Sequence, residues 1–233
     1  MRMHYLQHET FEDPAGILTW AKGRGFKISC TRLFAGDALP SASSFDWLVV
    51  MGGSMGVDDE DRYSWLREEK RFIGQAVESG AKVLGICLGA QLISHVLGGA
   101  VSRSEHQEIG WFPVTVTERG RSSEVFKGFP EEFVAFHWHG DTFETPVSAV
   151  CLAESVACRN QAFAYDGGRV VGLQFHLELD EPSIAKMAGY LEKKQASGLY
   201  VQSAADIRNA SDDRFRQIEG LLYRMLDNMQ AVR

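Results

Sequence analysis

Three residues of this chain have the types and spacing of a nucleophilic catalytic site: Cys87, His176 and Glu178. Cys87 stands two residues after Gly85 and two before Gly89, where a short apolar run is followed by a helical pattern. This spacing is typical of the nucleophile elbow, a sharp turn from strand to helix at which the helix N-terminus stabilises an anion. We therefore expect the pKa of the Cys87 thiol to lie below that of a free cysteine. A buried cysteine that merely fills space is the alternative interpretation.

His176 and Glu178 belong to the stretch GLQFHLELD, residues 172–180, which has the pattern of a strand. Residues two apart on a strand share a face, so Gln174, His176 and Glu178 are expected to point the same way. Glu178 can then accept a hydrogen bond from one ring nitrogen of His176 and leave the other facing Cys87. The pattern predicts a nucleophile, a base and a carboxylate that orients the base.

The other cysteines and histidines predict less. Cys30, Cys151 and Cys158 form no CxxC pair and lie in apolar or strand-like stretches, so we expect inert thiols in a reducing compartment. His137 and His139 share a strand face, which raises the possibility of a metal site. Zinc sites need three or four ligands, however, and the other obvious candidates belong to the catalytic group. The sequence therefore predicts no metal and no cofactor.

The composition is that of an ordinary globular protein, with 233 residues, 45% apolar and 24% charged residues, and a formal net charge of -7. We expect one domain over residues 1–233, with a helical tail from about residue 200. Lys and Arg form no basic block, which argues against a nucleic-acid partner. The sequence has no 18-residue apolar run and no charged leader before an apolar stretch. It therefore predicts no membrane span, no signal peptide and a cytoplasmic location.

The first half of the chain alternates strand and helix patterns, which predicts a parallel sheet with helices on both faces. The expected strands are residues 3–9, 27–34, 45–53 and 81–87, and the expected helices are residues 15–23 and 63–80. Strand patterns then follow one another directly, with a hairpin turn at Asp166-Gly167-Gly168. We expect these strands to extend the sheet in antiparallel fashion, over residues 111–118, 131–139, 149–155 and 161–178. The predicted fold is an open, mainly parallel α/β sheet of flavodoxin-like type, with the site at the C-terminal edge of its central strands.

Beyond Asp180 the chain is expected to be helical, first over residues 181–195 and then from Asp212 onward. The second of these helices carries one apolar stripe, made of Phe215, Ile218, Leu222, Met225, Leu226 and Met229. Such stripes usually pack on the core of their own domain. A helix that binds a partner protein is the alternative.

The motifs together resemble those of the class I glutamine amidotransferase family. GICLGAQ at 85–91 and QFHLE at 174–178 match two of its signatures, and VVMGGSMGVDDE at 49–60 and HWHGDTF at 137–143 resemble its other site motifs. The resemblance spans roughly residues 45–180, and this part of the chain is similar to the amidotransferase domain of GMP synthase. It implies a Cys-His-Glu triad in which Cys87 attacks the side-chain amide of glutamine. Ammonia is released, and a γ-glutamyl thioester remains for water to hydrolyse.

The resemblance also implies an oxyanion hole. One donor is the backbone N–H of Leu88, directly after the nucleophile, as in other elbows. The family's second donor is a backbone N–H of the glycine pair, which places it here at Gly53 and makes Gly52 a substrate-binding position. A plain turn after a strand is the alternative reading of this pair. Ser54 stands where the family commonly has proline, so we expect a freer loop.

Further substrate contacts are implied at positions that hold the amino-acid end of glutamine in the family. These are Gln91, one turn into the elbow helix, and the loop of His139, Gly140 and Asp141. Residues 103–111 lie near where relatives carry additional contacts, and for these a solvated loop is the default expectation.

The sequence contains no Gly-x4-Gly-Lys-Ser/Thr phosphate loop, and we expect no second domain that could use ammonia. Three functions remain open. The first is a stand-alone glutamine amide hydrolase that serves a separate ammonia-accepting synthetase subunit. The second is a self-contained γ-glutamyl peptidase that acts on other γ-glutamyl amides. The third is a catalytically idle binding or regulatory member of the fold, against which the intact catalytic group argues. Glutamine or a γ-glutamyl amide is the expected small-molecule substrate.

Overall fold

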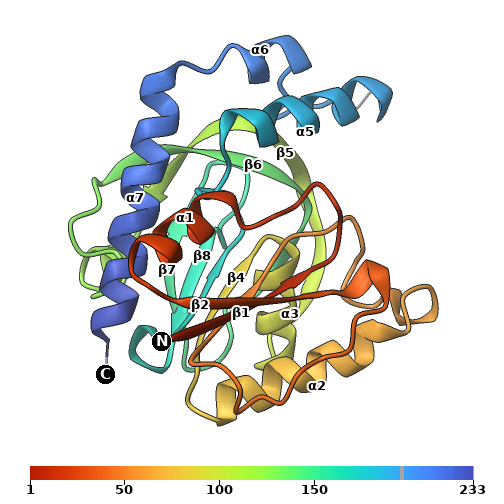
Figure 1. Ribbon diagram of the computed structural model, residues 1–233. Coiled ribbons are helices and arrows are strands. Elements are labelled where there is room, and N and C mark those ends of the chain that lie inside the picture. Colours follow the sequence, from red (N-terminus) through yellow and green to blue (C-terminus); the bar gives the residue numbers. More distant parts are fainter. Residues whose placement is uncertain (195–196, 233) are drawn as a thin grey trace.

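A computed structural model describes residues 1–194 and 197–232 of the chain. Within them lies one nine-stranded sheet with the order β2-β1-β3-β4-β9-β8-β7-β5-β6 (Figure 1). The first five strands of this order pair in parallel. They are β2 (Lys27–Arg32), β1 (Arg2–Gln7), β3 (Trp47–Val50), β4 (Lys82–Ile86) and β9 (Val170–Leu173).

The remaining pairs of the sheet are antiparallel. They involve β8 (Ala162–Tyr165), β7 (Val150–Glu154), β5 (Val101–Val116) and β6 (Glu132–Phe143). The hairpin turn between β8 and β9 falls at Asp166–Gly168, as predicted. The predicted α/β fold, a mainly parallel sheet with an antiparallel extension, is therefore confirmed.

The expectation of a solvated loop at residues 103–111 is wrong. Strand β5 begins at Val101, about ten residues before the predicted strand, and pairs with β6 along most of its length. The register shifts between Arg103 and Glu108, so this part of the strand is irregular. Glu108 is buried in this strand, although the polar sequence around it predicts an exposed position.

Helices cover both faces of the sheet, and each face has its own apolar core. On one face lie α1 (Ala15–Gly23), α5 (Glu181–Lys194), α6 (Ala204–Arg208) and α7 (Asp212–Ala231). On the other lie α2 (Trp65–Glu78) and α3 (Leu88–Val96) (Figure 1). The short α4 (Glu118–Arg121) packs on β7, and the 3-10 turns η1 (Leu33–Ala35), η2 (Asp59–Asp61) and η3 (Asp166–Gly168) lie in connections. No helix in the described part of the chain is both long and apolar enough to span a bilayer.

The apolar stripe of α7 faces the core, as predicted. Ile218, Leu222, Met225, Leu226 and Met229 are fully buried, while Phe215 is only partly buried against the same core. Helix α7 runs beside α1 at the edge of the molecule (Figure 1). The apolar stripe therefore packs against the core of its own chain.

The corner between β4 and α3 depends on two glycines. A Cβ atom added to Gly89 would lie 2.0 Å from the carbonyl oxygen of Val50, and one added to Gly85 would lie 2.5 Å from the Gly89 backbone. Helix α3 can approach β3 and β4 this closely only where both side chains are absent. The close approach holds Cys87 at the corner.

Gly89→Ala should therefore destabilise the protein by at least about 2 kcal/mol, because the methyl group must displace backbone atoms. Gly220→Ala is the matched control, since Gly220 lies in helix α7 with nothing within 4 Å of an added Cβ. Helix propensity alone favours alanine at both positions, and Gly220→Ala should stabilise by roughly 0.5–1 kcal/mol. Urea unfolding of the two variants measures both effects. Equal stability of Gly89→Ala and the wild type would contradict the packing argument.

Candidate active site

Cys87 lies between the end of β4 and the first residue of α3 with φ 50° and ψ -107°, a conformation that non-glycine residues rarely adopt. Its backbone N–H donates to the Leu173 carbonyl at 2.7 Å, which ties the corner to β9. The Sγ atom lies 3.6 Å from the Trp138 carbonyl and 3.6 Å from Nε2 of Gln174. Cys87 thus has the strand-turn-helix geometry of a nucleophile elbow, as predicted.

A cavity of about 310 Å³ opens above Cys87. Several residues predicted from the sequence line it: Gly53, Gln91, His139, Gly140 and Asp141. The structure therefore brings the elbow, the glycine pair and the 139–141 segment to one hollow at the C-terminal edge of the sheet. His176 and Glu178 are not among the residues that line this hollow.

His176 and Glu178 form a buried pair with 2.7 Å between Nδ1 and Oε1. The second carboxylate oxygen of Glu178 accepts the N–H of Leu177 at 3.1 Å. The other ring nitrogen of His176, Nε2, is buried and has no hydrogen-bond partner among the described residues. The ring and the Cys87 thiol are nevertheless close enough to shift each other's pKa.

The strand predicted to carry this pair is wrong in its extent, because β9 ends at Leu173. Gln174 still donates its N–H to Gln161, but His176 forms an isolated bridge with Phe136 of β6. The backbone thus leaves its neighbour β8 and crosses toward β6. The predicted hydrogen bond between His176 and Glu178 is present without the regular strand that suggested it.

Electrostatics prepare His176 to hold a proton. Burial lowers its pKa, but the charges of Glu178 and the nearby Cys87 outweigh burial, so the pKa of His176 lies well above its usual value. Burial also raises the pKa of the Cys87 thiol, although His176 and the Leu88 N–H act in the opposite direction. The expectation of a lowered pKa for Cys87 is therefore wrong, because loss of water outweighs the helix terminus.

The glycine loop after β3 is held by a buried histidine. Nδ1 of His8 lies 2.9 Å from the carbonyl oxygen of Gly52, and its Nε2 lies 2.7 Å from Glu69. Both side chains of this ion pair are fully buried. In a trans peptide the N–H points opposite to the carbonyl, so the Gly53 N–H points away from His8.

Glu12 is a site residue that no sequence motif indicated. It lines the Cys87 cavity from the segment between β1 and α1, and its Oε2 is buried without a hydrogen-bond partner among the described residues. A Cβ added to Gly52 would lie 2.0 Å from this oxygen and 3.5 Å from the Cβ of Cys87. Burial raises the pKa of Glu12 from 4.5 to about 7, although His176 and His8 oppose it.

The predicted substrate contacts are themselves held in place. Gln91 is buried, and its Nε2 lies 3.1 Å from the side-chain oxygen of Gln174 and 3.4 Å from the Asp141 carbonyl. His139 directs Nδ1 to the same carbonyl at 3.0 Å. Asp141 pairs with Arg103 of β5 at 3.3 Å at the cavity mouth.

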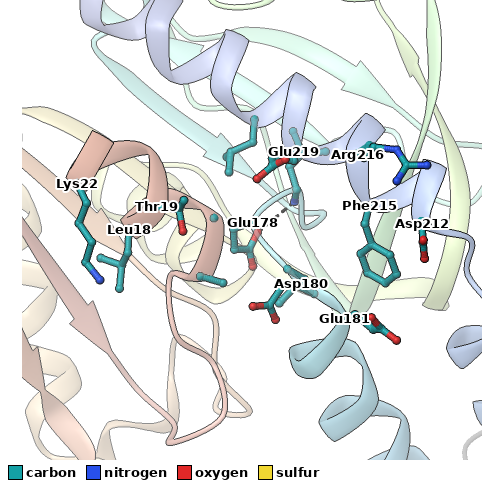
Figure 2. Close-up of a pocket in the computed structure, with 15 residues that line it drawn as sticks. Leu18, Thr19, Lys22, Glu178, Asp180, Glu181, Asp212, Phe215, Arg216 and Glu219 are labelled. Carbon is teal, nitrogen blue, oxygen red and sulfur yellow. Dashed lines mark hydrogen bonds between the residues drawn. The ribbon is translucent and has the colours of Figure 1, made fainter. Parts of the chain in front are cut away.

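Glu178 also borders a second hollow of about 650 Å³ on the other side of the site. Figure 2 shows Glu178 between α1, which carries Thr19 and Lys22, and α7, which carries Phe215. The N–H of Gly16 donates to the Glu178 backbone carbonyl at 2.9 Å. The start of α1 thus fixes the backbone of the residue that orients His176.

One group of described residues could hold a metal: Glu108, His137 and His139, all buried. The sequence pattern indicates the two histidines but no third ligand. Glu108 lies in the 103–111 stretch, for which a solvated loop is the default expectation.

Comparisons with known proteins agree with this fold. The profile of the family described as "Glutamine amidotransferase class-I" matches residues 24–184. The chain is 37% identical to the glutamine amidotransferase-like protein YfeJ of Salmonella typhimurium over 98% of this chain and 97% of that protein. A crystal structure of a glutamine amidotransferase from Thermotoga maritima superposes with a TM-score of 0.89 at 28% identity, covering 99% of this chain and 98% of that one. GMP synthase of Thermomicrobium roseum is 39% identical over 57% of this chain, but the match spans only 23% of that enzyme.

Glu12→Gln should change how stability depends on pH. Between about pH 4.5 and 7 the folded protein keeps a proton on Glu12 that the unfolded chain has released, so wild-type stability falls as pH rises through this range. The glutamine variant lacks this loss and should gain up to about 3 kcal/mol relative to the wild type between pH 4.5 and 8.

Denaturant unfolding of both proteins from pH 4.5 to 8 measures the difference. Glu105→Gln serves as the control, because its side chain is 88% exposed and should leave the wild-type curve unchanged. Parallel curves for Glu12→Gln and the wild type would show that Glu12 keeps an ordinary pKa.

Proposed function

Because this chain belongs to the class I glutamine amidotransferase family, we propose that it hydrolyses the side-chain amide of glutamine. The observation that carries the proposal is the buried His176–Glu178 pair, 2.7 Å apart, beside a cysteine on a nucleophile elbow. The arrangement supplies a nucleophile, a base and an orienting carboxylate.

In the proposed reaction Cys87 Sγ attacks the amide carbon while its proton passes to His176. The carbon–nitrogen bond of the tetrahedral intermediate then breaks, and His176 returns the proton to the leaving nitrogen, which departs as ammonia. Water attacks the remaining thioester with His176 as base, the carbon–sulfur bond breaks, and glutamate leaves. Because Glu178 raises the pKa of His176, the ring is suited to hold the proton in both steps.

We assign the oxyanion hole to the backbone N–H groups of Leu88 and Gly53. The Leu88 N–H is close enough to lower the pKa of the Cys87 thiol. The Gly53 N–H has no partner among the described hydrogen bonds. His8 orients the peptide between Gly52 and Gly53 through the Gly52 carbonyl. The proposed oxyanion hole therefore has a structural support, although Ser54 replaces the proline that is common in the family.

The amino-acid end of the substrate is proposed to lie over Gln91 and residues 139–141. Arg103 and Asp141 offer one positive and one negative charge at the cavity mouth, which suits the carboxylate and ammonium of an amino acid. Gly52 contributes by its lack of a side chain, since a methyl group there would strike Glu12.

Substitutions in the triad test the mechanism. Cys87→Ala and His176→Ala should each abolish ammonia release from glutamine, because each removes a bond-making group, while circular dichroism remains that of the wild type. Glu178→Gln keeps the shape but loses the charge, so a residual rate is expected. Cys30→Ala is the control and should retain full activity.

A glutamine-like electrophile should label Cys87 and spare Cys151, which mass spectrometry of peptides would show. Turnover by Cys87→Ala would exclude covalent catalysis.

A γ-glutamyl peptidase is the second candidate, because the catalytic motifs indicate the reaction class more firmly than the substrate. The comparison of kcat/KM for glutamine and for a panel of γ-glutamyl peptides decides between them. We expect glutamine to be the better substrate. The isolated protein should hydrolyse it slowly, and the rate should rise when an ammonia-accepting synthetase docks near Gly53. Much faster cleavage of γ-glutamyl peptides would establish the peptidase, and no hydrolysis of either would indicate an idle member of the fold.

A further inference from the structure

Three buried side chains converge behind the 139–141 segment: Glu108 on β5, and His137 and His139 on β6. Their exposed fractions are 1%, 0% and 5%. Oε2 of Glu108 lies 3.0 Å from Nε2 of His139, and Oε1 lies 3.8 Å from Nδ1 of His137. One donor atom from each of the three residues lies within 4.8 Å of those of the others.

The β5–β6 register creates this cluster. Glu108 is paired directly with His139, and paired residues of antiparallel strands point to the same face. His137 lies two residues before His139 and so shares that face. The third ligand that the sequence lacked is therefore supplied from the neighbouring strand.

His137 is unusual because neither of its ring nitrogens has a hydrogen-bond partner among the described residues, although the ring is completely buried. A neutral imidazole has one nitrogen with a lone pair, which can bind a metal ion. Buried polar atoms without partners are uncommon and often indicate a bound water or ion.

The contacts of His139 also indicate a bound ion or proton. Its Nδ1 faces the carbonyl oxygen of Asp141 at 3.0 Å, an acceptor, so Nδ1 must carry a hydrogen. In the neutral ring Nε2 is then a lone pair, and it faces Glu108 Oε2, another acceptor, at 3.0 Å. Two acceptors this close need a proton or a cation between them.

The spacing and the surroundings suit a cation. Bonds from zinc to nitrogen or oxygen are about 2 Å long, so two ligands at tetrahedral angles lie roughly 3 to 3.5 Å apart. The Glu108 carboxylate is held by Ser155 at 2.8 Å and by Gln161 at 2.6 Å, while Asp141 orients His139. Outer hydrogen bonds of this kind orient metal ligands in known sites.

We propose that Glu108, His137 and His139 form a binding site for a divalent transition-metal ion of the zinc type. The set of two imidazoles and one carboxylate offers three ligands, and the fourth position remains for a water molecule. The ion would replace the proton between His139 and Glu108 and fix the segment that lines the catalytic cavity. The proposal does not depend on the proposed hydrolysis, because its test is binding.

The test is calorimetric titration of the chelator-treated full chain with Zn²⁺ alone, in the Cys87→Ala background so that the reactive thiol cannot bind the ion. One equivalent should bind, and Glu108→Gln and His137→Asn should each weaken binding by at least about 100-fold. His106→Asn is the matched control, because His106 lies on the same strand β5 but outside the cluster, and it should bind as before.

Co²⁺ provides a measurement that needs no further substitution. Bound by this set, it should give visible absorption bands of a four- or five-coordinate nitrogen and oxygen site without a thiolate charge-transfer band. Absence of stoichiometric binding by the folded Cys87→Ala protein would overturn the proposal. Binding that is unchanged in folded Glu108→Gln and His137→Asn would overturn it equally, and a thiolate band would place the ion at another cysteine.

Discussion

The close approach of helix α3 to strands β3 and β4 is the constraint on which the rest of the site depends. Gly85 and Gly89 permit this contact, and between them Cys87 is held at a φ of 50°. Such a conformation costs on the order of 1–3 kcal/mol and persists only where the surroundings leave no alternative. Here the helix contact and the bond from Cys87 to Leu173 on β9 supply that restraint. The thiol is thereby fixed at the edge of the sheet, beside the first N–H of a helix.

Buried pairs of histidine and carboxylate then hold the segments around this point. His8 and Glu69 support the loop at Gly52, His176 and Glu178 form the proposed catalytic pair, and His139 and Glu108 anchor residues 139–141. The His8–Glu69 pair joins the segment after β1 to helix α2, and the His139–Glu108 pair adds a side-chain contact to the paired strands β5 and β6. Oε2 of Glu12 has no hydrogen-bond partner in the described part of the chain, and burial raises the pKa of this carboxyl to about 7.

The two halves of the sheet make different contributions. The parallel half provides the elbow and the glycine loop, which is the usual location for chemistry in open α/β sheets. The antiparallel half provides the wall of the cavity through β5 and β6. His176 lies where the chain passes from β9 toward β6, so the proposed base lies at the junction of the two halves. Family membership accordingly indicates the reaction class more firmly than the substrate, because the wall is what a substrate beyond its amide group would touch.

The sequence by itself determined the alternation of elements, the elbow at Cys87, the pairing of His176 with Glu178 and the buried stripe of α7. Each of these follows from local periodicity or from steric rules that act over a few residues. The extent of β5, the end of β9 before His176, and the raised pKa of Cys87 required the tertiary structure. So did the place of Glu12 in the Cys87 cavity and that of Glu108 beside His137 and His139. Burial and the convergence of polar groups depend on how the completed sheet brings distant segments together, and no local pattern records that.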